Sequence, residues 1–185
     1  IVIKGKSPKP VYLAIIDGNY ELRDATHLMG KKSGEVDDII HKEVDPKAEI
    51  LQHGMGAENG VLFSSLVSMS NRHNGRTGMG LVMASKNLKA VAVHGTNKIP
   101  VFDLTQYAPL RSEANRTLKQ DNEARILHEL GSAGVANYAE YLGQLPAKYY
   151  SQGAFPDVDK VSGSMMTESI LAGTSACQGC VIACG

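Results

Sequence analysis

The sequence predicts an α+β protein, with a mixed β-sheet and helix segment in residues 1–100 and the start of a helical domain in residues 101–185. Two patterns support this class. Short apolar runs bounded by Gly, Pro and Asp turns fill the first half, and apolar residues at helical spacing fill the second. Hydrophobic residues make up 43% of the 185, which is enough for a core. A boundary between the two parts is expected near residues 96–103.

The first part is expected to begin with strands. Ile1–Lys4 and Val11–Ile16 are short apolar runs. The second of them turns through Asp17-Gly18-Asn19 into Tyr20–Arg23, and an Asp-Gly pair between such runs is a strong hairpin signal. We therefore expect an antiparallel pair over residues 11–23.

Helix and strand are expected to alternate over the next fifty residues. Ser33 can cap a helix that runs to about Lys42, with Glu35 near its positive end. A short strand is expected over 48–51. A second helix is expected over 59–71, because apolar residues recur there at spacings of four and three. They are Leu62, Leu66 and Met69.

The second part is expected to be mostly helical. One helix begins near Leu104, and its apolar face holds Tyr107, Leu110, Ala114 and Leu118. Further apolar patterns predict helix around 126–130 and 135–142. A loop over 143–161 precedes a short helix over 164–171. We therefore expect this part to be built from helices and loops.

Charge and composition narrow the classes of function. Lys plus Arg and Asp plus Glu both number 19, which gives no support for nucleic acid or an anionic membrane as partner. No run of about 18 apolar residues is present, so no membrane span is expected. Three clustered cysteines fit a reducing compartment, so we expect a cytoplasmic protein. The chain opens on Ile1-Val2-Ile3 without Met, and we expect it to be a piece of a longer protein.

All three cysteines lie in the last nine residues, as Cys177, Cys180 and Cys184, with the spacing C-x2-C-x3-C. An odd number of thiols so close together is not a disulfide framework. Thiolates are soft ligands that suit iron–sulfur clusters and zinc, and either site would need a fourth ligand or an open position. Three thiols without a metal are the third interpretation.

A glycine-rich, basic stretch covers Gly75–Lys89, and we expect a helix before it. Three glycines, at positions 75, 78 and 80, allow close approach of the backbone to a ligand. Four cations could bind a phosphate or another polyanion: Arg72, Arg76, Lys86 and Lys89. The order G-x-x-G-x-G matches neither a Walker loop nor the dinucleotide fingerprint. A flexible turn with a solvated basic face explains the stretch equally well.

Together the two motifs resemble the aldehyde ferredoxin oxidoreductase family. The stretch Arg72–Val93 resembles that family's pterin-contacting segment, and C-x2-C-x3-C at the family's distance resembles its cluster motif. Three further segments also resemble the family, so the resemblance covers nearly the whole chain. These segments are Gly5-Lys6-Ser7, Asp24–Gly30 and Gly56–Asn59.

The resemblance implies a piece from about the middle of the N-terminal half of a tungsten, or less often molybdenum, enzyme. Such an enzyme holds its metal in two pterin dithiolenes and carries a 4Fe-4S cluster. It interconverts aldehydes and carboxylic acids and exchanges electrons with ferredoxin or a similar carrier. By position, Arg72, His73, Gly75 and Arg76 would contact the pterin, and Cys177, Cys180 and Cys184 would bind the cluster. No catalytic residue is assigned.

The resemblance also divides the chain into the later part of a pterin-binding base domain, 1–100, and the start of a helical domain that ends in the cluster motif, 101–185. It allows a homo-oligomer or a larger complex. A second interpretation within the family is a subunit that reduces an acyl or aromatic carboxylate derivative. The alternative from another class is a small iron–sulfur or zinc module without pterin, which leaves Arg72–Lys89 unexplained.

Overall fold

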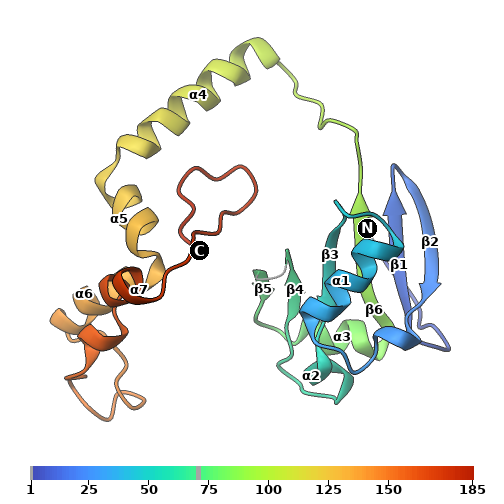
Figure 1. Cartoon of the computed structure of the whole chain (residues 1–185), viewed down its shortest axis with the longest axis horizontal. Helices are drawn as coiled ribbons and strands as arrows, with labels where there is room; N and C mark the ends of the chain where they lie inside the picture. The colour runs from blue at the N-terminus through green and yellow to red at the C-terminus, as the bar shows by residue number, and fades with distance from the viewer. Residues whose placement is uncertain (1, 70–71) are drawn as a thin grey trace. The chain divides into compact units, whose positions relative to one another are not determined.

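The structure is a computed structural model that describes residues 2–69 and 72–185. The chain divides into two compact units, residues 1–99 and 100–185, which we describe separately (Figure 1). Within the described residues there are six strands, all in the first unit, and seven α-helices. The α+β class is therefore confirmed.

One mixed sheet forms the centre of the first unit. Its strands are β1 (Val11–Ile16), β2 (Asn19–Asp24), β3 (Glu49–His53), β4 (Leu66–Ser68), β5 (Arg72–Asn74) and β6 (Leu88–His94). They lie in the order β2-β1-β6-β3-β4-β5. β1 and β6 run parallel, and the other neighbours run antiparallel. The last strand in the chain is thus a central strand, and β5 lies at an edge.

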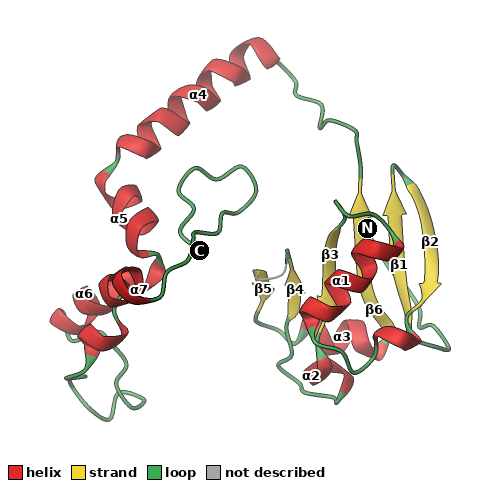
Figure 2. Cartoon of the chain, in the orientation of Figure 1, coloured by secondary structure: helices red, strands yellow, loops and turns green. Residues whose placement is uncertain are grey.

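Helices cover both faces of this sheet (Figure 2). α1 (Ser33–Glu43) packs on one face, where Val36 and Ile40 meet Tyr12 of β1. α3 (Met79–Ser85) packs on the other, where Met83 meets Leu13. Successive strand residues point to opposite faces, so one strand contributes to both cores. α2 (Met55–Glu58) and a 3-10 helix (Thr26–Leu28) complete the unit.

The predicted hairpin and the first helix are confirmed. Ile16 pairs with Asn19, so Asp17 and Gly18 form a two-residue turn with φ of +47° and +85°. The helix begins at Ser33, and the carboxylate of Glu35 accepts a 2.8 Å hydrogen bond from the backbone N–H of Lys32. Ser33 is therefore its first residue, not its cap.

The helix predicted over 59–71 is wrong. Gly60 has φ of +76°, so the chain leaves the helical conformation just after α2. Leu66 then joins β4, which pairs with β3 and β5, and the spacing that suggested a helix is overridden by non-local strand pairing. Residues 70–71 lie outside the described part of the chain.

The strand predicted at the N-terminus is also wrong over its described part. Val2–Lys4 forms no strand, and Val2 is 84% exposed. Gly5, with φ of +83°, separates these residues from the first strand. Ile1 lies outside the described residues.

The second unit is helical, as predicted. Its helices are α4 (Leu104–Gln120), α5 (Asn122–Leu130), α6 (Val135–Tyr141) and α7 (Gly163–Ser169), with 3-10 turns at Ser132–Gly134 and Val158–Val161. The carboxylates of Asp103 and Asp121 and the hydroxyl of Ser162 accept backbone N–H bonds at helix starts. Side-chain caps thus define three of the four helix starts.

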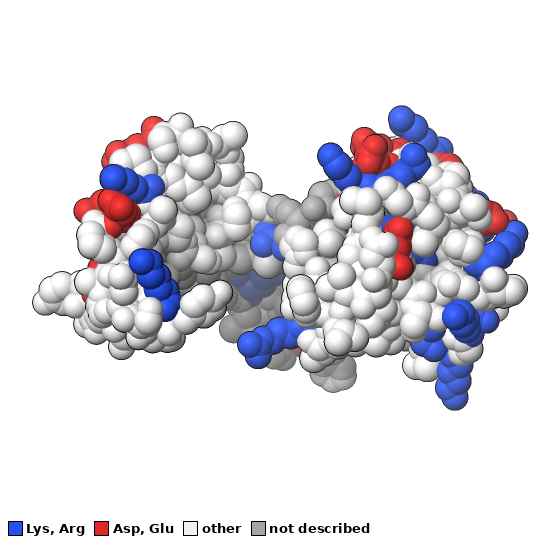
Figure 3. Space-filling model, turned by 90° about the horizontal axis from the view of Figure 1, so that it is seen from below, with Lys and Arg blue, Asp and Glu red and all other residues white. Residues whose placement is uncertain are grey.

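Charges of both signs occur on each unit in the face drawn in Figure 3. This distribution agrees with the zero net charge of the sequence. Among the described residues, no helix combines the length and the apolar character that a membrane crossing requires.

Candidate functional site

The four residues predicted to contact a pterin lie on one continuous segment at the edge of the sheet. Arg72 and His73 belong to β5, and Gly75 and Arg76 follow in the loop before α3. The ring Nδ1 of His73 lies 3.2 Å from the hydroxyl of Ser65, which fixes the ring beside the neighbouring strand. Both arginines thus belong to one five-residue segment at the edge of the sheet.

The glycines of this segment have different roles. A Cβ on Gly78 would lie 2.1 Å from the carbonyl oxygen of Leu62, and one on Gly80 would lie 2.5 Å from that of Ser65. Gly80 also donates its N–H to the carbonyl of Ser64 at 3.0 Å. Gly75, in contrast, has nothing within 4 Å of a built Cβ. Close approach to a ligand is therefore possible at Gly75. Gly78 and Gly80 instead accommodate the chain's own backbone, so the expectation that all three glycines serve a ligand is corrected for these two.

The cations of the segment also divide into two kinds. Arg76 is exposed and Arg72 is half-buried. Lys86 donates from Nζ to the carbonyl of Gly5 at 3.0 Å, and Lys89 is buried. The expectation that four cations face one anion is wrong for Lys89, and Lys86 is engaged by the chain itself. Among the four, Arg76 is the cation whose side chain is exposed at this edge of the sheet.

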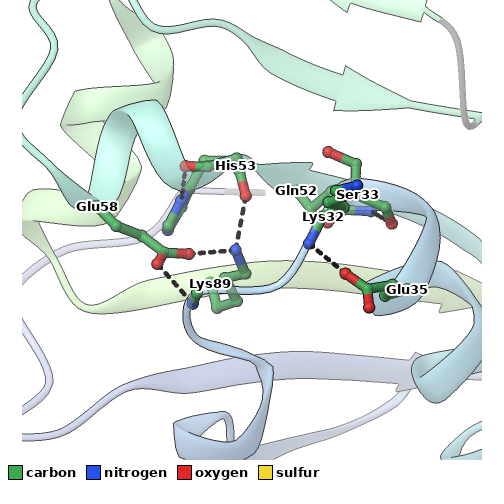
Figure 4. A network of polar contacts seen from close by, with 9 residues as sticks. Lys32, Ser33, Glu35, Gln52, His53, Glu58 and Lys89 are labelled. Carbon is green, nitrogen blue, oxygen red and sulfur yellow. Dashed lines mark hydrogen bonds and ion pairs between the residues drawn. The ribbon is translucent and has the colours of Figure 1, made fainter.

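The Lys89 side chain lies in a polar network that the sequence did not reveal (Figure 4). Its Nζ lies 2.5 Å from Oε1 of Glu58 and 2.9 Å from the carbonyl oxygen of His53. The other carboxylate oxygen of Glu58 accepts the N–H of Gly30 at 2.8 Å. The lysine charge is therefore neutralised inside the unit. A lysine within the apolar run of β6 was the one available signal, since a buried lysine requires a partner.

A bulge explains how this lysine turns inward. Val11 pairs with Leu88 and Tyr12 pairs with Ala90, so Lys89 is an additional residue in the β1–β6 ladder. A bulge of this kind redirects one side chain out of the regular alternation. Lys89, His53 and Glu58 line a cavity of about 210 Å³ together with residues of α3.

Burial changes the titration of this network. Burial lowers the pKa of the His53 ring, because the charged imidazolium is poorly solvated there. For Glu58, burial alone would raise the pKa, but hydrogen bonds from Lys89 and Gly30 and the charge of Lys89 hold it below its ordinary value. The network at neutral pH is thus an ion pair beside a neutral histidine.

The three cysteines lie on a closed loop of the second unit. Ser175 and Gly185 exchange backbone hydrogen bonds, of 2.5 Å and 3.0 Å, and so join the two ends of the loop. Inside it, Cys180 donates its N–H to the carbonyl of Cys177 at 3.0 Å. Cys177 and Cys180 are exposed, and Cys184 is half-buried. A ligand could therefore reach the thiols of this loop.

The three thiols of the loop suit either an iron–sulfur cluster or zinc. Nowhere in residues 2–69 and 72–185 do three His, Cys, Asp or Glu side chains converge as ligands for one metal ion. Structural zinc needs all four ligands around a single ion. A 4Fe-4S cluster binds separate irons through separate thiolates, and either group would need a further ligand or an open position beyond these three thiols.

Comparison with known families gives two matches along the chain. A family model described as "Aldehyde ferredoxin oxidoreductase, N-terminal domain" matches residues 1–95. A second, described as "Aldehyde ferredoxin oxidoreductase, domains 2 & 3", matches residues 109–185. The first contains the edge segment with both arginines, and the second contains the cysteine loop.

Individual relatives agree with the family models. The chain is 37% identical to a tungsten-containing aldehyde ferredoxin oxidoreductase of Pyrococcus furiosus and 36% identical to one of Thermococcus kodakarensis, over 100% of the chain and 31% of each relative. The chain thus spans about a third of the length of these relatives. Among solved structures, the active-site complex BamBC of benzoyl coenzyme A reductase matches with a TM-score of 0.78 and 28% identity, covering 98% of this chain and 30% of that one.

Proposed function

The chain belongs to the aldehyde ferredoxin oxidoreductase family, and on that premise we propose that it is part of a tungsten or molybdenum pterin oxidoreductase. The proposed reaction interconverts aldehydes and carboxylic acids. The observation that carries the proposal is the match of both family models in chain order, one over the arginine segment and the other over the cysteine loop.

The edge segment would hold the pterin. Arg72 and Arg76 offer planar guanidinium groups, which can bind phosphate oxygens or polar pterin edges through two parallel hydrogen bonds. The open space at Gly75 would admit the ligand to the backbone, and His73 would present its ring beside it. When bound, the metal supplies the two-electron chemistry, and the protein contributes binding and orientation.

The cysteine loop would provide three thiolate ligands to a 4Fe-4S cluster, from Cys177, Cys180 and Cys184. The exposure of Cys177 and Cys180 supports this role, because a preformed cluster must reach these thiols from outside the loop. The cluster would pass single electrons to ferredoxin or a similar carrier. We further propose a cytoplasmic enzyme that works as a homo-oligomer or within a larger complex.

A second candidate is favoured by the structural match to the benzoyl coenzyme A reductase complex. In this alternative the protein is a subunit that reduces an acyl or aromatic carboxylate derivative. Both candidates share the pterin and the cluster and differ in substrate.

A dye-reduction assay separates the two candidates. The full-length protein is purified anaerobically, and reduction of a low-potential viologen is followed on addition of short aliphatic and aromatic aldehydes. The first candidate predicts aldehyde-dependent dye reduction. Absence of that activity, together with oxidation of reduced dye by an aromatic coenzyme A thioester, would favour the second. Inactivity with every substrate in protein that contains tungsten or molybdenum would contradict both.

A further inference from the structure

A side chain from outside the cysteine loop bonds to the loop's backbone. His128, in the last turn of α5, lies with Nδ1 2.6 Å from the carbonyl oxygen of Ile182. A carbonyl can only accept, so Nδ1 carries the hydrogen and donates it. Ile182 lies between Cys180 and Cys184, so the bond holds the part of the loop that joins two of the thiols.

The carbonyl that accepts this bond belongs to a peptide group whose second residue has an unfavourable backbone conformation. The next residue, Ala183, has φ of +52°, a left-handed value that is unfavourable for a residue with a Cβ and persists only when surrounding contacts impose it. The peptide plane between Ile182 and Ala183 is set by ψ of the first and φ of the second. A hydrogen bond to its oxygen therefore restrains the angle that directs the chain into Cys184.

Open space adjoins this bond. His128 lines two cavities, one of about 430 Å³ that Val181 and Ile182 also line, and one of about 330 Å³ that Ala183 and Cys184 also line. Apolar side chains beside a cavity have partners on one side only and restrain the backbone weakly. The loop also approaches Gly131, the C-cap of α5, where a built Cβ would lie 3.2 Å from the carbonyl oxygen of Cys184.

We propose that His128 is a positioning residue for the metal-binding loop. Its Nδ1–H fixes the peptide between Ile182 and Ala183 and thereby the direction of the Cys184 thiol. The inference rests on the proposed function for the identity of the metal group, but the contact between His128 and the loop does not depend on it. Partners that orient ligand residues in this way usually change metal affinity by about 10–100-fold.

Hydrogen exchange tests the contact without any metal. Full-length apoprotein is compared with His128→Leu, which removes the donor, and with His128→Asn, whose amide N–H can occupy the place of Nδ1. Loss of one ordinary hydrogen bond predicts exchange about fivefold faster over residues 180–185 in His128→Leu. His128→Asn should restore most of the protection. Arg125→Ala, whose side chain lines the same cavity as Ile182, is the matched control and should exchange as the wild type does.

The holoprotein then tests the role toward the metal. We expect chelator-driven iron loss about tenfold faster in His128→Leu than in the wild type, and a shifted midpoint potential in the iron that remains, with recovery in His128→Asn. Unchanged exchange in His128→Leu would overturn the proposal. Faster exchange with unchanged iron loss and potential would overturn the positioning role and leave only a structural contact. A wild type without iron would instead refute the proposed function, while the exchange result would still decide the contact.

Discussion

Lys89 and Glu58 form a buried ion pair in the first unit, with Nζ 2.5 Å from Oε1 and side-chain exposures of 0% and 12%. The pair joins β6 to α2, and through the N–H of Gly30 it also holds the turn before α1. Removing one charge from such a pair leaves the other without compensation in a poorly solvated place. The pair therefore connects β6, α2 and the turn before α1, and its two residues line one cavity with residues of α3.

Breaking this pair should destabilise the protein. We expect Lys89→Met to lower the free energy of unfolding by about 3 kcal/mol, because Glu58 is left partly buried without its partner. The double variant Lys89→Met/Glu58→Gln should recover part of that loss. Urea unfolding measures both, with exposed Lys98→Met as the control expected to change stability by less than about 0.5 kcal/mol. Equal losses in the single and double variants would show that the two charges are not coupled.

Stability should also depend on His53 as the pH falls. Burial lowers the pKa of His53 in the folded state, so the unfolded chain binds a proton before the folded protein does. The contribution of His53 to the free energy of unfolding is therefore full above the ordinary histidine pKa of about 6.5. It decreases as the pH falls toward the lowered pKa of the folded state. The depressed pKa of Glu58 adds a loss of the same sign below its ordinary range. Thermal unfolding between pH 5 and 8 should show a shallower slope in His53→Gln, and an identical slope would refute the assignment.

The glycines before α3 should tolerate substitution very differently. Gly78→Ala places a Cβ 2.1 Å from a backbone oxygen at φ of +68°, so we expect a loss of about 3 kcal/mol or failure to fold. Gly75→Ala meets nothing within 4 Å and should stay within about 1 kcal/mol of the wild type. Soluble yield and melting temperature measure both. Comparable effects of the two substitutions would contradict the division of roles between these glycines.

Arg76 should be required for the pterin and not for the cluster. Losing hydrogen bonds from a charged group typically costs about 1.5–3 kcal/mol, so Arg76→Ala should lower tungsten or molybdenum per chain about tenfold or more. Lysine cannot reproduce the planar fork, so Arg76→Lys should recover little. Iron per chain should stay unchanged, as should both metals in Arg111→Ala on the exposed surface of α4. Full tungsten or molybdenum content in Arg76→Ala would remove this residue from the proposed site.

Local signals made part of the fold predictable from sequence. The Asp17-Gly18 turn specifies its own hairpin, and the capping carboxylates of Asp103 and Asp121 lie beside the helices that they start. The strand around Leu66 was missed because its pairing with β3 comes from distant residues, which no local spacing encodes. The buried pair was missed for the same reason, since its two members are 31 residues apart and the inward turn of Lys89 depends on a bulge.

The two candidate segments were likewise visible in the sequence only in part. The segment Arg72–Arg76 of the first unit and the cysteine motif of the second are each contiguous in sequence, so their resemblance to the family's motifs could be recognised there, and their roles stay a prediction. The roles of Gly78 and Gly80 could not be deduced, because both depend on how Leu62 and Ser65 approach them. His128 was also missed, since it lies 54 residues from the carbonyl that it bonds.

Metal content of the native protein tests the central claim most directly. The full-length protein is purified anaerobically from its source, and iron, tungsten, molybdenum and zinc per chain are counted by elemental mass spectrometry. A pterin oxidoreductase with one 4Fe-4S cluster predicts about four irons together with one tungsten or molybdenum. Zinc alone, or iron without tungsten or molybdenum, would contradict the account and would favour a small metal-binding module without pterin.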